Sequence, residues 1–228
     1  MTPDSHDDVA TAQDVLRSAL RDVLAPAARL QGYKGSSPTW RKSNTSGDVA
    51  VVNVQSSSGS TSNELRCVVN VAVVPEPWLR WERERLGAGM PKSIGESFGL
   101  YRDRLHPSGT PAGADGWWEV GASAQAATEA VSDMVTQLEL RGWDELDRML
   151  TRDGMLAKVR AGDLGFARRQ YFALLFARAE ALLLMDDGPS EALDELLASA
   201  LEGASPAQRE SAMRFEDWVR RQAAAATQ

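Results

Sequence analysis

Few side chains in this sequence are suited to covalent chemistry or to binding a metal ion. Cys67 is the only cysteine, and the histidines are His6 and His106. A nucleophilic cysteine needs an adjacent base, whereas Cys67 lies in the apolar run at residues 65–74, which predicts a small buried side chain. Zinc sites need several cysteine or histidine ligands that converge. We therefore expect no metal site and no cofactor.

Two short segments resemble catalytic or binding loops, and both fail on spacing. The segment GAGMPKS at residues 87–93 has Pro91 before Lys92, and Leu86 stands where a phosphate loop has its first glycine. A proline has no N–H to donate to a phosphate. The DDG at residues 186–188 lacks the ligand spacing of a calcium loop. No G-x-S-x-G motif occurs, so we expect no catalytic residues.

Polar side chains on one face of the predicted strands are the stronger candidates for function. In residues 49–55, Asn53 and Gln55 lie opposite the apolar face, and in residues 65–74 Arg66 and Asn70 do the same. Asn and Gln offer both donors and acceptors to a partner. The alternative is a solvated face with cross-strand hydrogen bonds.

Tryptophan and arginine side chains extend this candidate surface. Adjacent tryptophans in one strand point to opposite faces, so of Trp117 and Trp118 one is expected in the core and the other beside the polar face. An exposed tryptophan near Arg102 and Arg104 is typical of an interface anchor, although the same arginines could stack on it within the fold. The candidate binding residues are Trp40, Asn53, Gln55, Asn70, Arg102, Arg104, Trp117 and Trp118.

Charge and hydropathy limit the classes of function. The 228 residues carry a net charge of −7, so nucleic-acid binding, which needs clustered basic residues, is not expected. No apolar run reaches the roughly 18–20 residues that span a bilayer. The acidic N-terminal segment MTPDSHDDVA does not resemble a signal peptide. With a single cysteine, these features favour a cytoplasmic protein.

The positions of these residues depend on an α+β arrangement. An amphipathic helix is predicted from Asp8 to Leu24, with Asp7 as its N-cap, a kink or end at Ala25 before Pro26, and Gly32 closing the element. Strands are predicted at residues 39–43, 49–55, 65–74, 98–105 and 117–121. Helices are predicted at residues 78–86, 127–141, 143–150, 153–160 and 167–185, then from Pro189 and from a capping box at Ser205–Gln208.

The predicted fold is thus a mainly antiparallel, meandering sheet of four or five strands, packed on an N-terminal helix and followed by an all-helical C-terminal cap. We place the helix and sheet core at residues 1–122 and the helical region at residues 123–228, and expect the two to form one cooperative unit. The oligomeric state is left open.

The order of several short motifs resembles a known family. They are Gly32–Tyr33–Lys34, Thr39–Trp40–Arg41, VVNVQ at 51–55, VVNVAV at 68–73, residues 102–105, and Asp115–Gly116–Trp117–Trp118. Over roughly residues 10–155 the chain resembles the bacterial domain of unknown function 4304. The resemblance implies an α+β fold with a meandering sheet, and it supplies no catalytic residues. The last seventy or so residues look like a helical extension.

Two functions remain for this sequence. The first is a non-enzymatic protein-interaction module, immunity-like or regulatory, that binds another protein or a peptide through the polar face of its sheet. The alternative is a small-molecule-binding protein or hydrolase-type enzyme with residues 87–116 as a lid, for which Glu119 or His106 would be the general base.

Overall fold

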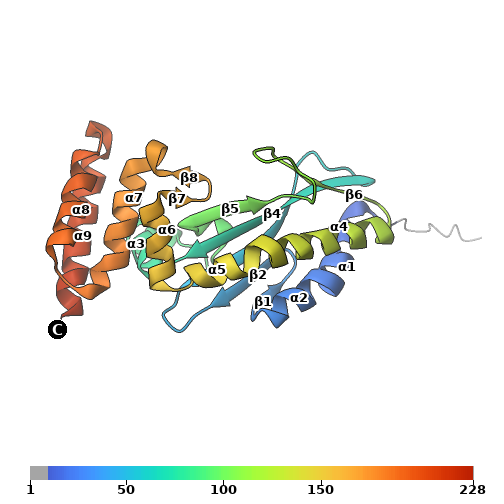
Figure 1. Cartoon of the computed structure of the whole chain (residues 1–228), viewed down its shortest axis with the longest axis horizontal. Helices are drawn as coiled ribbons and strands as arrows, with labels where there is room; N and C mark the ends of the chain where they lie inside the picture. Colours follow the sequence, from blue (N-terminus) through green and yellow to red (C-terminus); the bar gives the residue numbers. More distant parts are fainter. Residues whose placement is uncertain (1–9, 228) are drawn as a thin grey trace, which may run out of the picture. The chain divides into compact units, whose positions relative to one another are not determined.

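The computed structural model describes residues 10–227 and has the predicted α+β fold (Figure 1). Its main sheet has six strands in the order β1–β2–β3–β4–β5, with β6 also paired to β4, and β7 pairs with β8 in a separate hairpin. The main sheet is therefore one strand larger than predicted. The chain divides into two compact units: residues 10–42, 51–71 and 104–144 form the first, and residues 43–50, 72–103 and 145–227 form the second.

The N-terminal helix consists of three helical segments, α1 (Ala12–Ala19), a π-helical turn (Leu20–Leu24) and α2 (Ala25–Leu30). Thr11 caps it through a capping box with Asp14, so the predicted start at Asp8 is wrong, and the predicted cap Asp7 lies outside the described residues. The helix does not end at Ala25 but continues to Leu30, because the wide turn before Pro26 accommodates a residue that has no N–H. Gly32, at φ +83°, closes the element as expected.

The first strands form an antiparallel meander. Strand β1 (Lys34–Ser36), which the sequence did not predict, pairs with β2 (Thr39–Ser43) across a turn that contains the cis Ser37–Pro38 peptide. Gly35 has φ +124°, and a Cβ there would lie 2.6 Å from the Thr39 carbonyl oxygen, so this close approach requires glycine.

Strand β4 (Glu64–Val74) is the central strand, and β3 (Val49–Ser56) pairs along one side of β4. Strands β5 (Tyr101–Leu105) and β6 (Trp118–Gly121) share the other side of β4, and β6 pairs antiparallel with the first four residues of β4. The register sets Cys67 opposite Trp118, so these side chains share the apolar face. Both are buried, and burial raises the pKa of the Cys67 thiol to about 12, as suits a core side chain.

Helix α4 (Ala124–Gln137) covers the first unit's apolar face with α1, and Figure 1 shows it running along the strands. Its buried side chains recur at helical spacing, and Ser123 caps its first turn. It continues through a π-helical turn (Leu138–Gly142) into α5 (Trp143–Met149). The first unit is therefore a sheet with one face covered by helices, and Gln55 and Asn70 lie on the opposite face of their strands.

In the second unit, α3 (Glu76–Leu86) follows β4 directly and begins two residues before the prediction, after Pro75. Single 3-10 turns at Gly87–Gly89 and Glu96–Phe98 lead to β5, which is shorter than the predicted strand. Helix α6 (Arg152–Ala161) is followed by β7 (Asp163–Leu164) and β8 (Ala167–Arg168). The prediction of a purely helical C-terminal region was therefore wrong at this hairpin.

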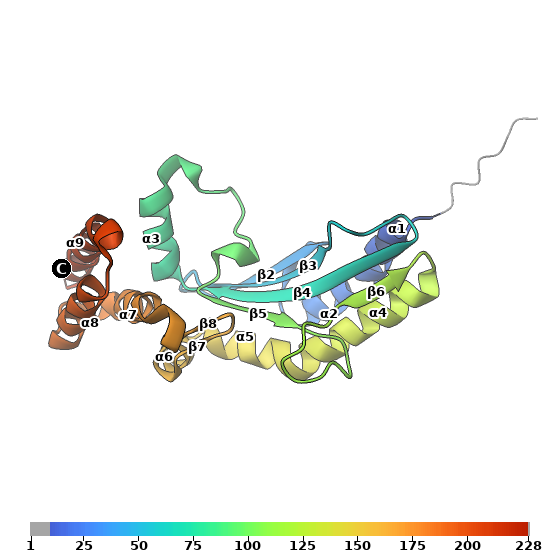
Figure 2. The ribbon, with the colours of Figure 1, turned by 90° about the horizontal axis from the view of Figure 1, so that it is seen from above.

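Three long helices complete the second unit: α7 (Arg169–Leu184), α8 (Glu191–Glu202) and α9 (Arg209–Ala226), shown from two directions in Figures 1 and 2. The predicted capping box at Ser205 and Gln208 is confirmed. Ser190 rather than Pro189 begins α8, because its hydroxyl accepts the Leu193 N–H. Trp81 of α3 packs edge-on against Phe215 of α9 at 5.0 Å, within the apolar core of these helices.

No helix among residues 10–227 combines the length and apolar character that a membrane span requires. The expectation that residues 1–122 and 123–228 behave as one cooperative unit stays a prediction.

Candidate functional site

Polar side chains meet across neighbouring strands of the first unit and form the candidate site. The Asn70 amide of β4 donates a 2.8 Å hydrogen bond to the Gln55 side-chain oxygen of β3, and Arg104 Nε of β5 donates to the Asn70 oxygen at 3.4 Å. Cross-strand neighbours lie close enough for such pairs. Asn70 is buried, at 5% exposed, whereas Gln55 is exposed, so the network reaches from the interior to the surface.

Arg104 also connects this network to an aromatic side chain. Its guanidinium lies 5.3 Å from the centre of the Trp117 ring and donates a 2.9 Å hydrogen bond to Asp115. The Trp117 indole N–H donates to the same carboxylate at 3.2 Å. The hydrogen bond from Arg104 lowers the pKa of Asp115 below its usual value. We call Gln55, Asn70, Arg104, Asp115 and Trp117 the polar strip.

The two adjacent tryptophans lie as the strand pattern predicts. Trp118 is buried, at 3% exposed, and its indole N–H donates to Asp133 at 2.8 Å. Trp117 is half-buried, beside Arg104. One tryptophan thus belongs to the core and the other to the polar strip, although Trp117 lies just before β6, which begins at Trp118.

The structure does not bring the remaining predicted residues into the polar strip. Trp40 is fully buried, and its indole nitrogen has no hydrogen-bond partner among the described residues. Asn53 donates a 2.8 Å hydrogen bond to the Thr39 hydroxyl. Arg102 belongs to the second unit, where it lies 3.9 Å from Glu96 and 5.9 Å from the Phe166 ring centre.

Glu119 and His106, the two side chains considered as general bases, are already engaged. Glu119 forms a 2.5 Å ion pair with Arg66. The Nδ1 atom of His106 lies 3.2 Å from both the backbone nitrogen and the carbonyl oxygen of Gly116. Both side chains therefore have partners within the fold.

Asp133 of α4 holds in place the loop between β5 and β6, which carries His106, Asp115 and Trp117. It accepts hydrogen bonds from the Ser108 backbone N–H, the Ser108 hydroxyl and the Trp118 indole. Burial opposes its ionisation, but the hydrogen bonds outweigh burial and lower the pKa of Asp133. This serine and carboxylate therefore form a loop anchor.

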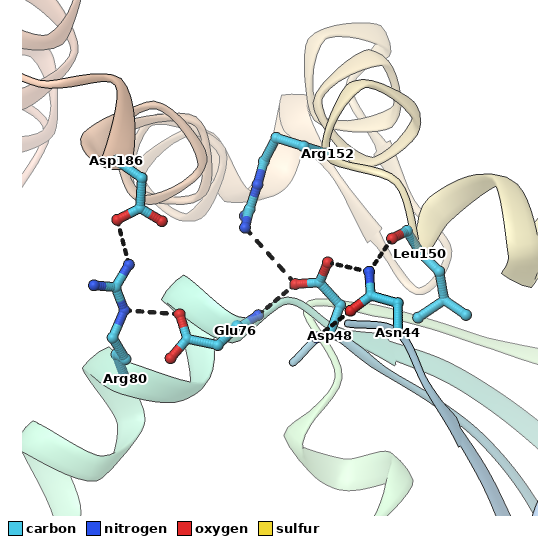
Figure 3. Close-up of polar contacts among 7 residues, drawn as sticks. All are labelled: Asn44, Asp48, Glu76, Arg80, Leu150, Arg152 and Asp186. Carbon is cyan, nitrogen blue, oxygen red and sulfur yellow. Dashed lines mark hydrogen bonds and ion pairs between the residues drawn. The ribbon is translucent and has the colours of Figure 1, made fainter. Parts of the chain in front are cut away.

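A second polar network, built around Asp48, lies in the second unit (Figure 3). Asp48 is 4% exposed and occupies the turn between β2 and β3. One carboxylate oxygen accepts the Asn44 amide at 2.8 Å, and the other accepts the backbone N–H of Glu76 at 2.7 Å. The Asn44 amide also donates to the Leu150 carbonyl at 2.6 Å, and Arg152 lies 3.8 Å from Asp48.

The contacts of Asp48 give it a structural role. Glu76 is the first residue of α3, so the carboxylate satisfies an otherwise free N–H at the positive end of the helix dipole. Arg80, one turn later, forms ion pairs with Glu76 at 2.8 Å and with Asp186. In the sequence, residues 44–48 only connect the predicted strands at 39–43 and 49–55. Their partners could not be found from local pattern, because they lie up to 106 residues away.

No group of three or more His, Cys, Asp and Glu side chains in the described part of the chain is arranged to hold a metal ion. The polar strip itself consists of polar and aromatic side chains that are paired with one another.

Comparison with known proteins finds one family. Neither the curated proteins nor the solved structures contain a match to this chain. The profile of the family described as "Domain of unknown function (DUF4304)" matches residues 24–148, a range that includes every residue of the polar strip and that confirms the resemblance predicted from the sequence motifs. With more than half of its length matched, the chain belongs to the DUF4304 family.

Proposed function

We propose that this protein is a non-enzymatic protein-interaction module, immunity-like or regulatory, whose contact surface is the polar strip. The observation that carries the proposal is the Arg104–Trp117 stack, which Asp115 and Asn70 hold in place. Arginine and tryptophan are enriched among residues that dominate binding energy. Side chains that are already fixed lose less conformational entropy when a partner binds.

The partner class follows from charge and chemistry. Gln55 is exposed and Trp117 is half-buried, so the polar strip offers an amide and an indole to a protein or peptide. A net charge of −7 disfavours nucleic acid. A cytoplasmic location and a bacterial source belong to the same proposal.

The alternative is a small-molecule-binding protein or hydrolase-type enzyme with residues 87–116 as a lid. The ion pair between Asp115 and Arg104 favours it, because Asp115 belongs to the end of that segment. The engagement of Glu119 with Arg66 and of His106 with Gly116 counts against it. We therefore rank this alternative second.

Site-specific photo-crosslinking tests the proposed contact surface. A photoreactive amino acid is placed at exposed Gln55 and, as a control, at exposed Glu139 of the same unit, and the full chain is irradiated in a lysate of the organism that encodes it. We expect a discrete protein adduct from position 55 and none from position 139. Arg104→Ala should reduce that adduct severalfold, whereas the matched variant Arg141→Ala should leave it unchanged. Equal adducts from both positions, or an adduct insensitive to Arg104→Ala, would exclude the polar strip as the contact surface.

A further inference from the structure

The second unit contains an open groove whose walls are aromatic and whose charge is positive. Its volume is about 650 Å³, and α3 and α7 supply most of its lining. Trp78 and Trp81 of α3 line it together with Tyr171 and Phe172 of α7. Tyr171 is 74% exposed and Phe172 is 49% exposed, so large apolar side chains face solvent at this groove.

A local break in α7 produces this exposure. Phe172 has φ −134° and ψ 40°, which interrupts the helix after its first turn. The buried face of α7 begins only at Phe176. Tyr171 and Phe172, at the break, therefore extend the apolar surface without packing into the core, and solvent-exposed apolar surface of this kind marks contact sites.

Arg178 gives the groove its specific chemistry. It lines the groove, and its Nε and Nη2 atoms are buried without a hydrogen-bond partner among the described residues. Its guanidinium lies 5.2 Å from the centre of the Phe215 ring. Burial lowers its pKa. Arg178 as a whole is half-buried, and its two buried nitrogens leave strong donors unsatisfied, which costs free energy.

The other charges of the groove do not satisfy Arg178. Glu82 pairs with Arg85 at 2.5 Å, and both line the groove. Two arginines and one glutamate among the lining residues leave a net charge of +1. The groove thus has one positive charge in excess, and that charge lies beside apolar surface.

We propose that this groove binds an acidic peptide segment of a protein partner, with a carboxylate on Arg178 and a neighbouring apolar side chain against Trp78 and Tyr171. Arginine binds carboxylates through paired N–H donors. Tyr, Trp and Arg are enriched where proteins meet. The groove is open to solvent, whereas small-molecule sites enclose most of their ligand, and this favours a peptide. The proposal is independent of the function assigned to the polar strip.

Selection of peptides against the full-length protein tests the groove. Phage-displayed random peptides are selected on the wild type, and one selected peptide is labelled for fluorescence polarisation. We expect the selected sequences to be enriched in Asp or Glu next to an aromatic or aliphatic residue. Failure to select peptides above background, or selection without acidic residues, would overturn the proposal.

Variants assign the binding to Arg178. Arg178→Gln should weaken the labelled peptide at least tenfold, and Arg178→Lys should weaken it less. The matched variant Arg214→Gln, at an exposed arginine of α9 that does not line the groove, should bind as the wild type does. Arg104→Ala should also leave peptide binding unchanged, so failure of the groove and failure of the polar strip are distinguishable. Equal binding by Arg178→Gln and the wild type would refute the assignment.

Two further measurements keep the test decisive. Tyr171→Ala changes an exposed side chain, so we expect the fold to stay intact. This variant should weaken binding of the labelled peptide severalfold. If Arg178→Gln does not fold, this variant decides the outcome. Competition with 3-phenylpropionate separates a peptide from a small aromatic acid: inhibition by the acid at concentrations as low as those of unlabelled peptide would overturn the peptide proposal.

Discussion

The polar strip and the groove around Arg178 both combine arginine with aromatic side chains, but their polar groups are satisfied in different ways. Arg104 hydrogen-bonds Asn70 and Asp115 while it stacks on Trp117. Arg178 contacts the Phe215 ring, but its Nε and Nη2 lack hydrogen-bond partners in the described structure. The side chains of the polar strip are therefore paired within the fold. The groove carries an arginine without an ion-pair partner among the described residues, and the proposed peptide would supply one.

The Asp48 carboxylate is buried and has several partners within the fold. Its removal should therefore lower the free energy of unfolding by the largest amount. Asp48→Ala leaves the Glu76 N–H and Arg152 without the carboxylate, and the Asn44 amide keeps only the Leu150 carbonyl. We expect the free energy of unfolding to fall by about 3 kcal/mol and the melting temperature by roughly 10 °C, as measured by circular dichroism.

The matched control for this loss is Asp187→Ala, at an exposed aspartate of the same unit. Its free energy of unfolding should change by less than about 0.5 kcal/mol. Equal stabilities for the two variants would show that the Asp48 network does not hold the fold.

Replacing Arg178 should instead raise the free energy of unfolding. Arg178→Met removes two buried donors that lack partners and keeps an unbranched apolar side chain. After the loss of the cation–π contact with Phe215 is subtracted, we expect the free energy of unfolding to rise by about 1 kcal/mol. Urea denaturation measures this change, and a clear loss of stability would mean that Arg178 is satisfied in solution.

The equivalent change in the polar strip should destabilise the protein. Arg104→Met removes the hydrogen bond to Asn70 and the stack on Trp117, and Asn70 is left buried. We expect the free energy of unfolding to fall by roughly 0.5–1 kcal/mol. If Arg104→Met and Arg178→Met shift stability in the same direction, the contrast between the two regions is wrong.

The smallest expected change in stability is that of Asp133→Asn, and it should depend on pH. Its pKa is lowered in the folded state by the bonds from Ser108 and Trp118, so its ionised form contributes stability above the unfolded pKa of about 3.9. That contribution is lost as pH falls through the folded pKa. The stability difference between the wild type and Asp133→Asn should be constant from pH 7 to about 5 and shrink below about pH 4.

Urea denaturation at each pH, followed by tryptophan fluorescence, measures this difference. Glu139→Gln, at an exposed glutamate of the same unit, serves as the control and should show no such trend. A difference that grows on acidification would contradict the assigned role of Asp133.

Local pattern was sufficient to predict most of the fold. Alternation of apolar side chains predicted β2, β3 and β4 to within a residue or so, and the Ser205 capping box predicted where the last helix begins. Elements that depend on distant contacts were missed. The β7–β8 hairpin is one, because the Phe166 N–H donates to the Arg102 carbonyl and Gly165, at φ +78°, leaves room for that approach.

The candidate site shows the same division between sequence and structure. The sequence by itself determined that Gln55 and Asn70 occupy the polar face of their strands, because side chains alternate strictly along a strand. It also predicted that Trp117 and Trp118 diverge, although Trp117 lies just before the strand. Only the tertiary structure decided which polar groups find partners. Pairing depends on contacts between residues far apart in the chain, so it left Arg104 satisfied by Asn70 and Asp115 and two nitrogens of Arg178 without a hydrogen-bond partner in the described structure.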